Sequence, residues 1–179
     1  VVTGFRVSPG GAQQASGVTP DLATFAKIIA GGLPGGAVCG REAILELLDF
    51  EKAADKGFEK IGHQGTYNAN PVSAAAGLAA LEIIANDDMC GRANAYGTAL
   101  RSELNLVLTE EGVPWAVYGE YSTFHVFTNP KGRPDVSPES FNPLDLDYSE
   151  LKSNAPGSVQ KMRLAMILNG VDIRGLSLI

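Results

Sequence analysis

The 179-residue sequence has only two cysteines, Cys39 and Cys90, which are too far apart to form a CxxC pair. We therefore expect neither a disulfide scaffold nor a cysteine-based metal site, and we expect a reducing, cytoplasmic setting. Basic residues are also few and scattered: 14 Lys and Arg stand against 20 Asp and Glu, for a net charge of −6. This argues against a surface for nucleic acid or for an anionic membrane. No apolar run approaches the roughly 20 residues of a membrane-spanning helix.

Most short catalytic motifs are missing as well. The sequence contains no GxSxG, Walker, HExxH or GxGxxG pattern. Its two histidines, His63 and His125, have no metal-ligand spacing between them. His125 alternates with apolar residues and is expected to pack in a strand, whereas either a structural or a functional role is open for His63. With 45% hydrophobic and 19% charged residues, the chain has the composition of a packed globular protein.

Short apolar strands and helices alternate up to about residue 86, which predicts an α/β layer. The expected strands are 1–5, 22–29 (ending near Lys27) and 37–40, and the expected helices are 41–48 and 71–85. The expected loops are 6–20 and 62–71, and the charged segment 51–60 is expected to be solvated. Pro71 favours a helix start because proline suits the first helical position. The helix after it is apolar on nearly all sides, so we expect it to be buried on most faces.

A shift in composition at residues 86–89 predicts a domain boundary, with an α/β domain over 1–86 and a smaller α+β domain over 87–179. In the second domain we expect a helix to about residue 111, two strands, a long loop over 131–157 and a helix over 158–168. Apolar residues at helical spacing predict the core stripe of the first of these helices. They are Ala93, Leu100, Leu104, Val107 and Leu108.

Lys27 stands alone in an otherwise uncharged stretch, between apolar residues and four glycines. A surface lysine at the end of a strand is one interpretation. The other is an amine held in an apolar site, where desolvation favours the neutral form and a neutral amine can attack a carbonyl to form a Schiff base. The glycines that follow Lys27 allow the backbone to approach a ligand closely.

The segment GTYNANP, residues 65–71, is a second candidate site. It can be a simple loop that leads into a proline-initiated helix. It can also be an anion site, because Gly65, the Thr66 hydroxyl and nearby N–H groups lie about one turn before a helix start, where a phosphate is well accommodated.

Taken together, these segments resemble the class III aminotransferases, which are fold-type I pyridoxal-phosphate (PLP) enzymes with an α/β large domain. The matching stretches are VVTGFR, GVTPDLATFAKIIAGGLPGGAVCGR and GTYNANPVSAAAGLAALEII, with a weaker match in MRLAMILNGVDI. Their order and spacing agree with the family over about residues 1–110. Within the family the sequence looks most similar to the glutamate-1-semialdehyde 2,1-aminomutase group.

The resemblance implies a role for each candidate residue. Lys27 falls on the family's Schiff-base lysine, which holds PLP and shuttles a proton during amino-group transfer. Thr66, next to Gly65, falls on the threonine that contacts the cofactor phosphate across a dimer interface. Val1 falls where an apolar residue packs against the pyridine ring. The resemblance therefore implies a homodimer with shared sites, acting on small-molecule amino donors and acceptors.

The family's aspartate for the pyridine nitrogen falls two positions before Val1, so we expect the sequence to be cut at both ends and to be inactive alone. Three alternatives stay open. They are an intermolecular aminotransferase for an amine or β-amino acid, another PLP reaction such as racemisation or decarboxylation, and a non-catalytic dimerising relative.

Overall fold

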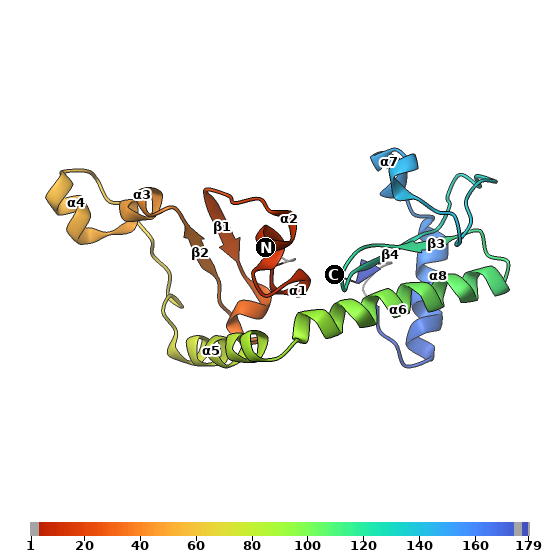
Figure 1. Ribbon diagram of the computed structural model, residues 1–179, viewed down its shortest axis with the longest axis horizontal. Coiled ribbons are helices and arrows are strands. Elements are labelled where there is room, and N and C mark those ends of the chain that lie inside the picture. Colours follow the sequence, from red (N-terminus) through yellow and green to blue (C-terminus); the bar gives the residue numbers. More distant parts are fainter. Residues whose placement is uncertain (1–3, 174–176, 179) are drawn as a thin grey trace. The chain divides into compact units, whose positions relative to one another are not determined.

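The computed structural model describes residues 4–173 and 177–178 and divides the chain into two compact units, Val1–Cys90 and Gly91–Ile179 (Figure 1). Each unit combines helices with a small antiparallel sheet, so the expected mixture of helix and strand is confirmed. Within the part of the chain that the structure describes, no helix is both long enough and apolar enough to cross a membrane.

The first unit contains short helices and one two-stranded hairpin. Its elements are α1 (Gly4–Val7), α2 (Gly11–Ser16), β1 (Leu22–Phe25), the 3₁₀ turn η1 (Lys27–Ala30), β2 (Ala37–Gly40), α3 (Glu42–Leu45), η2 (Glu46–Leu48), α4 (Phe50–Lys56) and α5 (Pro71–Asn86). β1 and β2 pair antiparallel, with Leu22 opposite Gly40 and Phe25 opposite Ala37. The expected strand near Lys27 is confirmed but shorter, because it ends at Phe25 and the chain then turns through η1.

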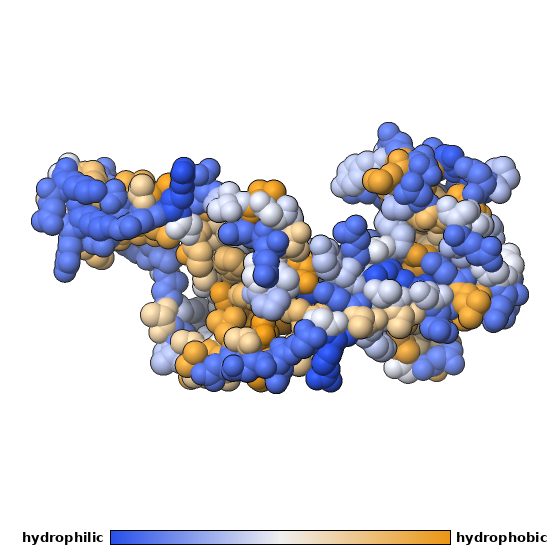
Figure 2. Space-filling view, in the orientation of Figure 1, coloured by the Kyte–Doolittle hydropathy of each residue, from blue (hydrophilic) through white to orange (hydrophobic). Residues whose placement is uncertain are grey.

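α5 begins where the sequence predicts. The Asn70 side chain accepts hydrogen bonds from the N–H groups of the second and third helical residues, and Pro71 occupies the first position. The expectation that this helix is buried on most faces is wrong for this chain: only Gly77 and Ile84 are buried. The reason is that α5 packs chiefly against one short element, η1. Figure 2 shows apolar residues gathered along α5 and around the adjoining turn.

The expected strand over residues 1–5 is wrong in its described part, because Gly4 and Phe5 belong to α1, while residues 1–3 lie outside the described residues. Two contacts hold this short helix. The Phe5 ring stacks against Phe25 with centroids 5.9 Å apart, and the thiol of Cys90 donates to the Phe5 carbonyl at 2.7 Å. The expected loop over 6–20 likewise contains a helix, α2.

The charged segment 51–60, expected to be solvated, is mostly exposed and contains most of the helix α4. Asp49 caps this helix by accepting from the N–H groups of Glu51 and Lys52 at 2.9 and 3.2 Å. Lys52 also pairs with Glu42 at 2.9 Å, which joins α4 to α3. A side-chain cap and a few ion pairs are therefore enough to order a short polar helix.

The second unit packs two helices against a three-stranded antiparallel sheet. Its elements are α6 (Met89–Glu110), which begins at the end of the first unit, β3 (Ala116–Tyr118), β4 (Phe124–Phe127), η3 (Pro143–Asp145), α7 (Tyr148–Leu151), α8 (Pro156–Leu168) and β5 (Ser177–Leu178). The strand order is β3-β4-β5. Val117, Phe124 and Val126 form the centre of its core; Leu100, Leu104, Leu108, Trp115, Val159 and Met162 pack against them.

The predicted stripe of α6 is confirmed at Leu100, Leu104 and Leu108. It is wrong at Ala93, which is exposed, and at Val107, which is 52% exposed. The expected loop over 131–157 contains η3 and α7, each started by a side-chain cap, Asn142 and Asp147. The two predicted strands are confirmed as β3 and β4, and the last predicted helix as α8.

Candidate functional site

Lys27 is the first residue of η1, two positions after the end of β1. Its backbone has φ 64°, in the left-handed region that lysine rarely adopts. The side chain is exposed. Within residues 4–173 and 177–178, the Lys27 amine makes no hydrogen bond and no ion pair. The described residues therefore present this amine freely and do not enclose it in an apolar pocket.

The turn that carries Lys27 is held at both ends. Gly31 follows η1 with φ 60°, again in the left-handed region, and its N–H donates to the Ile28 carbonyl at 3.0 Å. Ala30 is 4% exposed, so the last residue of the turn is packed although its first residue is not. η1 packs on α5, the helix that follows the second candidate segment.

Thr66 lies in a turn that precedes α5 by a few residues. The Asn68 N–H donates to the Gly65 carbonyl at 3.0 Å, and Ala69 takes the left-handed conformation with φ 56°. Gly65 and Thr66 are exposed, and the Thr66 hydroxyl has no hydrogen-bond partner among the described residues. Because Asn70 occupies the first free N–H groups of α5, donors to an anion here come from the Gly65–Thr66 turn and not from the helix end.

The structure relates the two candidate segments through one helix. The Thr66 turn leads into the start of α5, and the Lys27 turn packs against that helix further along. The third candidate, Val1, lies outside the described residues.

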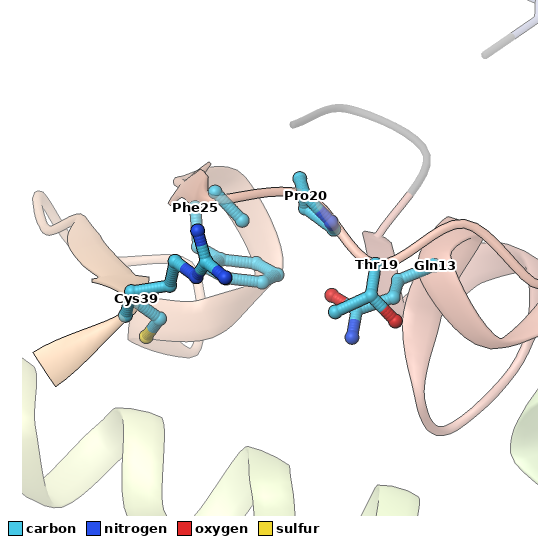
Figure 3. Close-up of a pocket in the computed structure, with 8 residues that line it drawn as sticks. Gln13, Thr19, Pro20, Phe25 and Cys39 are labelled. Atoms are coloured by element: carbon cyan, nitrogen blue, oxygen red, sulfur yellow. The ribbon is translucent and has the colours of Figure 1, made fainter.

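An open pocket of the first unit lies beside the hairpin and has a volume of about 380 Å³. It is lined by Gln13, Thr19, Pro20, Ala23, Phe25, Cys39, Gly40 and Arg41. Figure 3 shows Phe25 and Cys39 on one side and Gln13 and Thr19 on the other. Lys27 and Thr66 do not line it. The sequence reasoning missed this pocket because it depends on α2, which was expected to be a loop.

Arg41, the cation at this pocket, is not available as a free anion-binding group. Its guanidinium pairs with Asp21 at 2.9 Å, and its N–H donates to the Asp21 carbonyl at 3.0 Å. Both side chains are largely exposed, so this pair contributes little to stability. Its effect is to close the open end of the hairpin.

His125 lies half-buried in β4, as expected for a histidine that packs in a strand. Its ring lies 5.3 Å from that of Tyr118, and burial lowers the pKa of His125 below its ordinary value of 6.5. Across residues 4–173 and 177–178, no three His, Cys, Asp or Glu side chains are grouped to hold a metal ion.

Comparison with known proteins identifies relatives of the sequence. The sequence profile of the class-III aminotransferases matches residues 1–121. The glutamate-1-semialdehyde 2,1-aminomutase of Methanosarcina acetivorans is 37% identical over 127 residues, which are 71% of this chain and 28% of that protein. The enzyme of the same name from Nitratidesulfovibrio vulgaris DP4 is 42% identical over 127 residues, again 71% of this chain and 28% of that protein. The chain thus spans less than a third of the length of these relatives.

Solved structures resemble the chain over nearly its whole length. An omega-transaminase from Sphaerobacter thermophilus matches with a TM-score of 0.79 and 33% identity, covering 98% of this chain and 37% of that one. A β-phenylalanine aminotransferase from Variovorax paradoxus matches with a TM-score of 0.74 and 26% identity, covering 96% and 36%. A transaminase with PLP bound matches with a TM-score of 0.74 and 30% identity, covering 96% and 35%. The expected fold, α/β of fold-type I, is confirmed.

Proposed function

Because the chain belongs to the class-III aminotransferase family, we propose that Lys27, Gly65 and Thr66 serve a PLP-dependent enzyme of amino-group transfer. The observation that carries this proposal is the family match over residues 1–121, which spans both the Lys27 turn and the Thr66 turn. The activity belongs to the intact enzyme, of which this chain is about 28% when measured against its relatives.

The two turns suit the two reactive ends of PLP. Its aldehyde requires an amine with no competing partner, and the Lys27 amine is exposed without an ion pair among the described residues. Its phosphate requires hydroxyl and N–H donors, which the exposed Gly65–Thr66 turn offers.

Each residue then has a distinct task. Bound PLP supplies an electron-withdrawing ring that stabilises negative charge on the substrate carbon. Lys27 would bind the aldehyde covalently. Once an amino substrate displaces it, the Lys27 Nζ would take a proton from the substrate carbon and deliver it to the carbon of the cofactor that carried the aldehyde. Thr66 and Gly65 would anchor the phosphate. Val1, outside the described residues, would pack against the ring.

The proposal includes a homodimer in which Thr66 of one subunit reaches the site that contains Lys27 of the other. It also assigns residues 1–86 to the end of the large PLP-binding domain and residues 87–179 to the small C-terminal domain. The exposed turn around Thr66 is compatible with contact to a second subunit.

Borohydride reduction of the PLP-saturated intact enzyme, followed by peptide mass spectrometry, tests the assignment of Lys27. We expect the pyridoxyl label on Lys27 and an absorption band near the visible edge; both should be lost in Lys27→Ala and kept in the control Lys60→Ala. No band and no label in the wild type would instead support the non-catalytic dimerising relative.

Thr66 has its own matched pair of variants. Thr66→Val removes the hydroxyl and should weaken PLP binding about tenfold to a hundredfold, since a hydrogen bond to a charged group contributes about 1.5–3 kcal/mol. Thr66→Ser keeps the hydroxyl and should bind nearly as well as the wild type. Equal affinities for the two variants would remove Thr66 from the phosphate site.

Substrate use separates the two close versions of the reaction. The relatives in sequence are named glutamate-1-semialdehyde 2,1-aminomutases, whereas solved structures that resemble the chain include an omega-transaminase and a β-phenylalanine aminotransferase. An aminomutase converts one substrate without an added amino acceptor. An intermolecular aminotransferase requires one, and a panel of amine and β-amino-acid donors with a keto acid would reveal it.

A further inference from the structure

The turn η1 and the helix α5 meet backbone to backbone. A Cβ atom at Gly77, in the middle of α5, would overlap the carbonyl oxygen of Ile29 on the turn. A Cβ atom at Gly31, at the end of the turn, would overlap the carbonyl oxygen of Ala76 on the helix. Each element therefore provides a glycine opposite the backbone of the other, and a side chain at either position would separate the two elements.

This contact lies next to a strained backbone. Lys27 has φ 64° and Gly31 has φ 60°, so the four-residue turn both begins and ends near the left-handed region. A non-glycine residue keeps such a conformation only when its surroundings impose it. Ala30, between the two, is 4% exposed and belongs to the surface of the turn that is packed.

We propose that Gly77, together with Gly31, is a positioning residue for Lys27: the close approach of α5 fixes the turn from which the Lys27 amine is presented. This inference rests on the proposed function of Lys27 in holding PLP. It adds that α5 sets the position of the Lys27 amine. The turn that leads into the N-terminus of α5 contains Thr66. One helix then determines the placement of the covalent anchor and leads from the phosphate-binding turn.

The collision at Gly77 is with main-chain atoms, so no rotation of a side chain relieves it. The turn or the helix must move by on the order of 1 Å, and a displacement of that size at a reacting group can cost about a hundredfold in rate. Alanine is at the same time a better helix former than glycine, which offsets part of the loss in stability. A positional effect on Lys27 is therefore expected to exceed the effect on folding.

Gly97 provides a matched control on α6. A Cβ atom there would lie 2.7 Å from the Tyr121 carbonyl oxygen and 2.7 Å from the Ser122 Cα atom. Gly97→Ala thus introduces the same kind of collision between a helix and a backbone, but with a loop of the second unit. Any general cost of such a collision appears in both variants, and an effect on Lys27 appears only in Gly77→Ala.

The experiment measures how fast PLP becomes attached to Lys27 of the intact apoenzyme, by borohydride quenching and peptide mass spectrometry, alongside the melting temperature. We expect Gly77→Ala to slow attachment about tenfold to a hundredfold and to lower kcat more than it changes KM. The pH midpoint of the cofactor absorption band should also move. Gly97→Ala should lower the melting temperature but leave the attachment rate and the midpoint unchanged.

A milder pair of variants covers the case in which Gly77→Ala does not fold. A Cβ atom at Gly35 would lie 2.7 Å from the Ala30 Cβ atom, so Gly35→Ala pushes the same turn through a side chain. It should slow attachment, and Ala30→Gly in the same protein should restore it because the colliding methyl group is gone.

Wild-type attachment rates in Gly77→Ala and Gly35→Ala, or an equal fall in Gly77→Ala and Gly97→Ala, would overturn the positioning role while leaving Lys27 as the anchor. A wild-type enzyme that carries no label on Lys27 would refute the proposed function itself, and with it this role. The site of the label therefore distinguishes the two failures.

Discussion

The side-chain amide of Asn105 forms two hydrogen bonds with the backbone of Val117, one donated to the carbonyl at 2.8 Å and one accepted from the N–H at 2.7 Å. Asn105 is on α6 and Val117 is on β3, whose other side pairs with β4. Val117 is 6% exposed. One helical side chain therefore satisfies the backbone N–H and carbonyl of Val117 on β3. An additional strand would otherwise pair with these groups.

We predict that Asn105→Ala destabilises the second unit by about 2–4 kcal/mol, because it leaves a buried N–H and a buried carbonyl without partners. The matched control is Leu106→Ala, at a neighbouring helical position that is 54% exposed. Urea unfolding would give the stability change, and hydrogen exchange of the Val117 amide would locate it. Similar losses in the two variants would show that the amide bonds contribute nothing specific.

Glu150 carries a carboxylate that is buried against two cations. Its side chain is 5% exposed, with Oε2 at 3.0 Å from Lys131 Nζ and 3.6 Å from the Arg133 guanidinium, whereas both cations reach solvent. Because either cation alone still neutralises the carboxylate, Lys131→Ala and Arg133→Ala should each cost less than about 1 kcal/mol. The double variant leaves a buried charge unpaired and should cost about 3 kcal/mol or more.

A double-mutant cycle measured by urea unfolding checks this prediction. It gives the excess, which is the loss of stability in the double variant beyond the sum of the losses in the two single variants. Repeating the cycle with Glu150→Gln removes the charge, so the excess should disappear. An additive double variant in the Glu150 protein would mean that water, and not the two cations, compensates the carboxylate.

Local signals predicted some elements and failed for others. The start of α5 was predictable because Asn70 and Pro71 are adjacent in the sequence and act on the helix that they begin. The short helix α1 was not, because a contact from elsewhere in the chain holds it, the stacking of Phe5 on Phe25. The bonds of Asn105 to Val117 join residues twelve positions apart on different elements, and no pattern in the sequence marks them.

The candidate site, like the fold, was predictable from the sequence only in part. The residues Lys27, Gly65 and Thr66 could be chosen from sequence because their order and spacing carry the family pattern. Their surroundings could not. The left-handed backbone of Lys27 and the glycine contact with α5 depend on how two elements pack.

His125 should make the stability of the second unit depend on pH. Burial lowers its pKa in the folded state below 6.5, so the unfolded chain binds a proton first as the pH falls. The contribution of the neutral ring is fully present above about pH 6.5 and is lost as the pH falls from there to the folded pKa.

The matched variant is His125→Gln, which does not titrate. Urea unfolding at several pH values from about 5 to 8 should show a steeper loss toward acid in the wild type than in the variant. Parallel curves for the two proteins would mean that the ring is solvated in the folded state.

Cys90 should be a protected thiol whose reaction reports the opening of the first unit. It is buried, it donates to the Phe5 carbonyl at 2.7 Å, and burial, with a smaller contribution from Asp88, raises the pKa of its thiol above 9.0. Both effects oppose alkylation, which requires an accessible thiolate. In a Cys39→Ser protein, iodoacetamide should therefore label Cys90 at least about a hundredfold more slowly than a free thiol, equivalent to an opening cost of about 2.7 kcal/mol.

The comparison is Cys39 in a Cys90→Ser protein. Cys39 is exposed on β2 and should react with iodoacetamide as fast as a free thiol. Labelling of Cys90 should accelerate when urea opens the first unit, and it should accelerate at lower urea in a Phe5→Ala protein, which loses the stacking on Phe25 that holds α1 in place. If Cys90 reacted as fast as Cys39 in the folded protein, the contact between α1 and the start of α6 would be open in solution, and the Phe5 carbonyl would not be its partner.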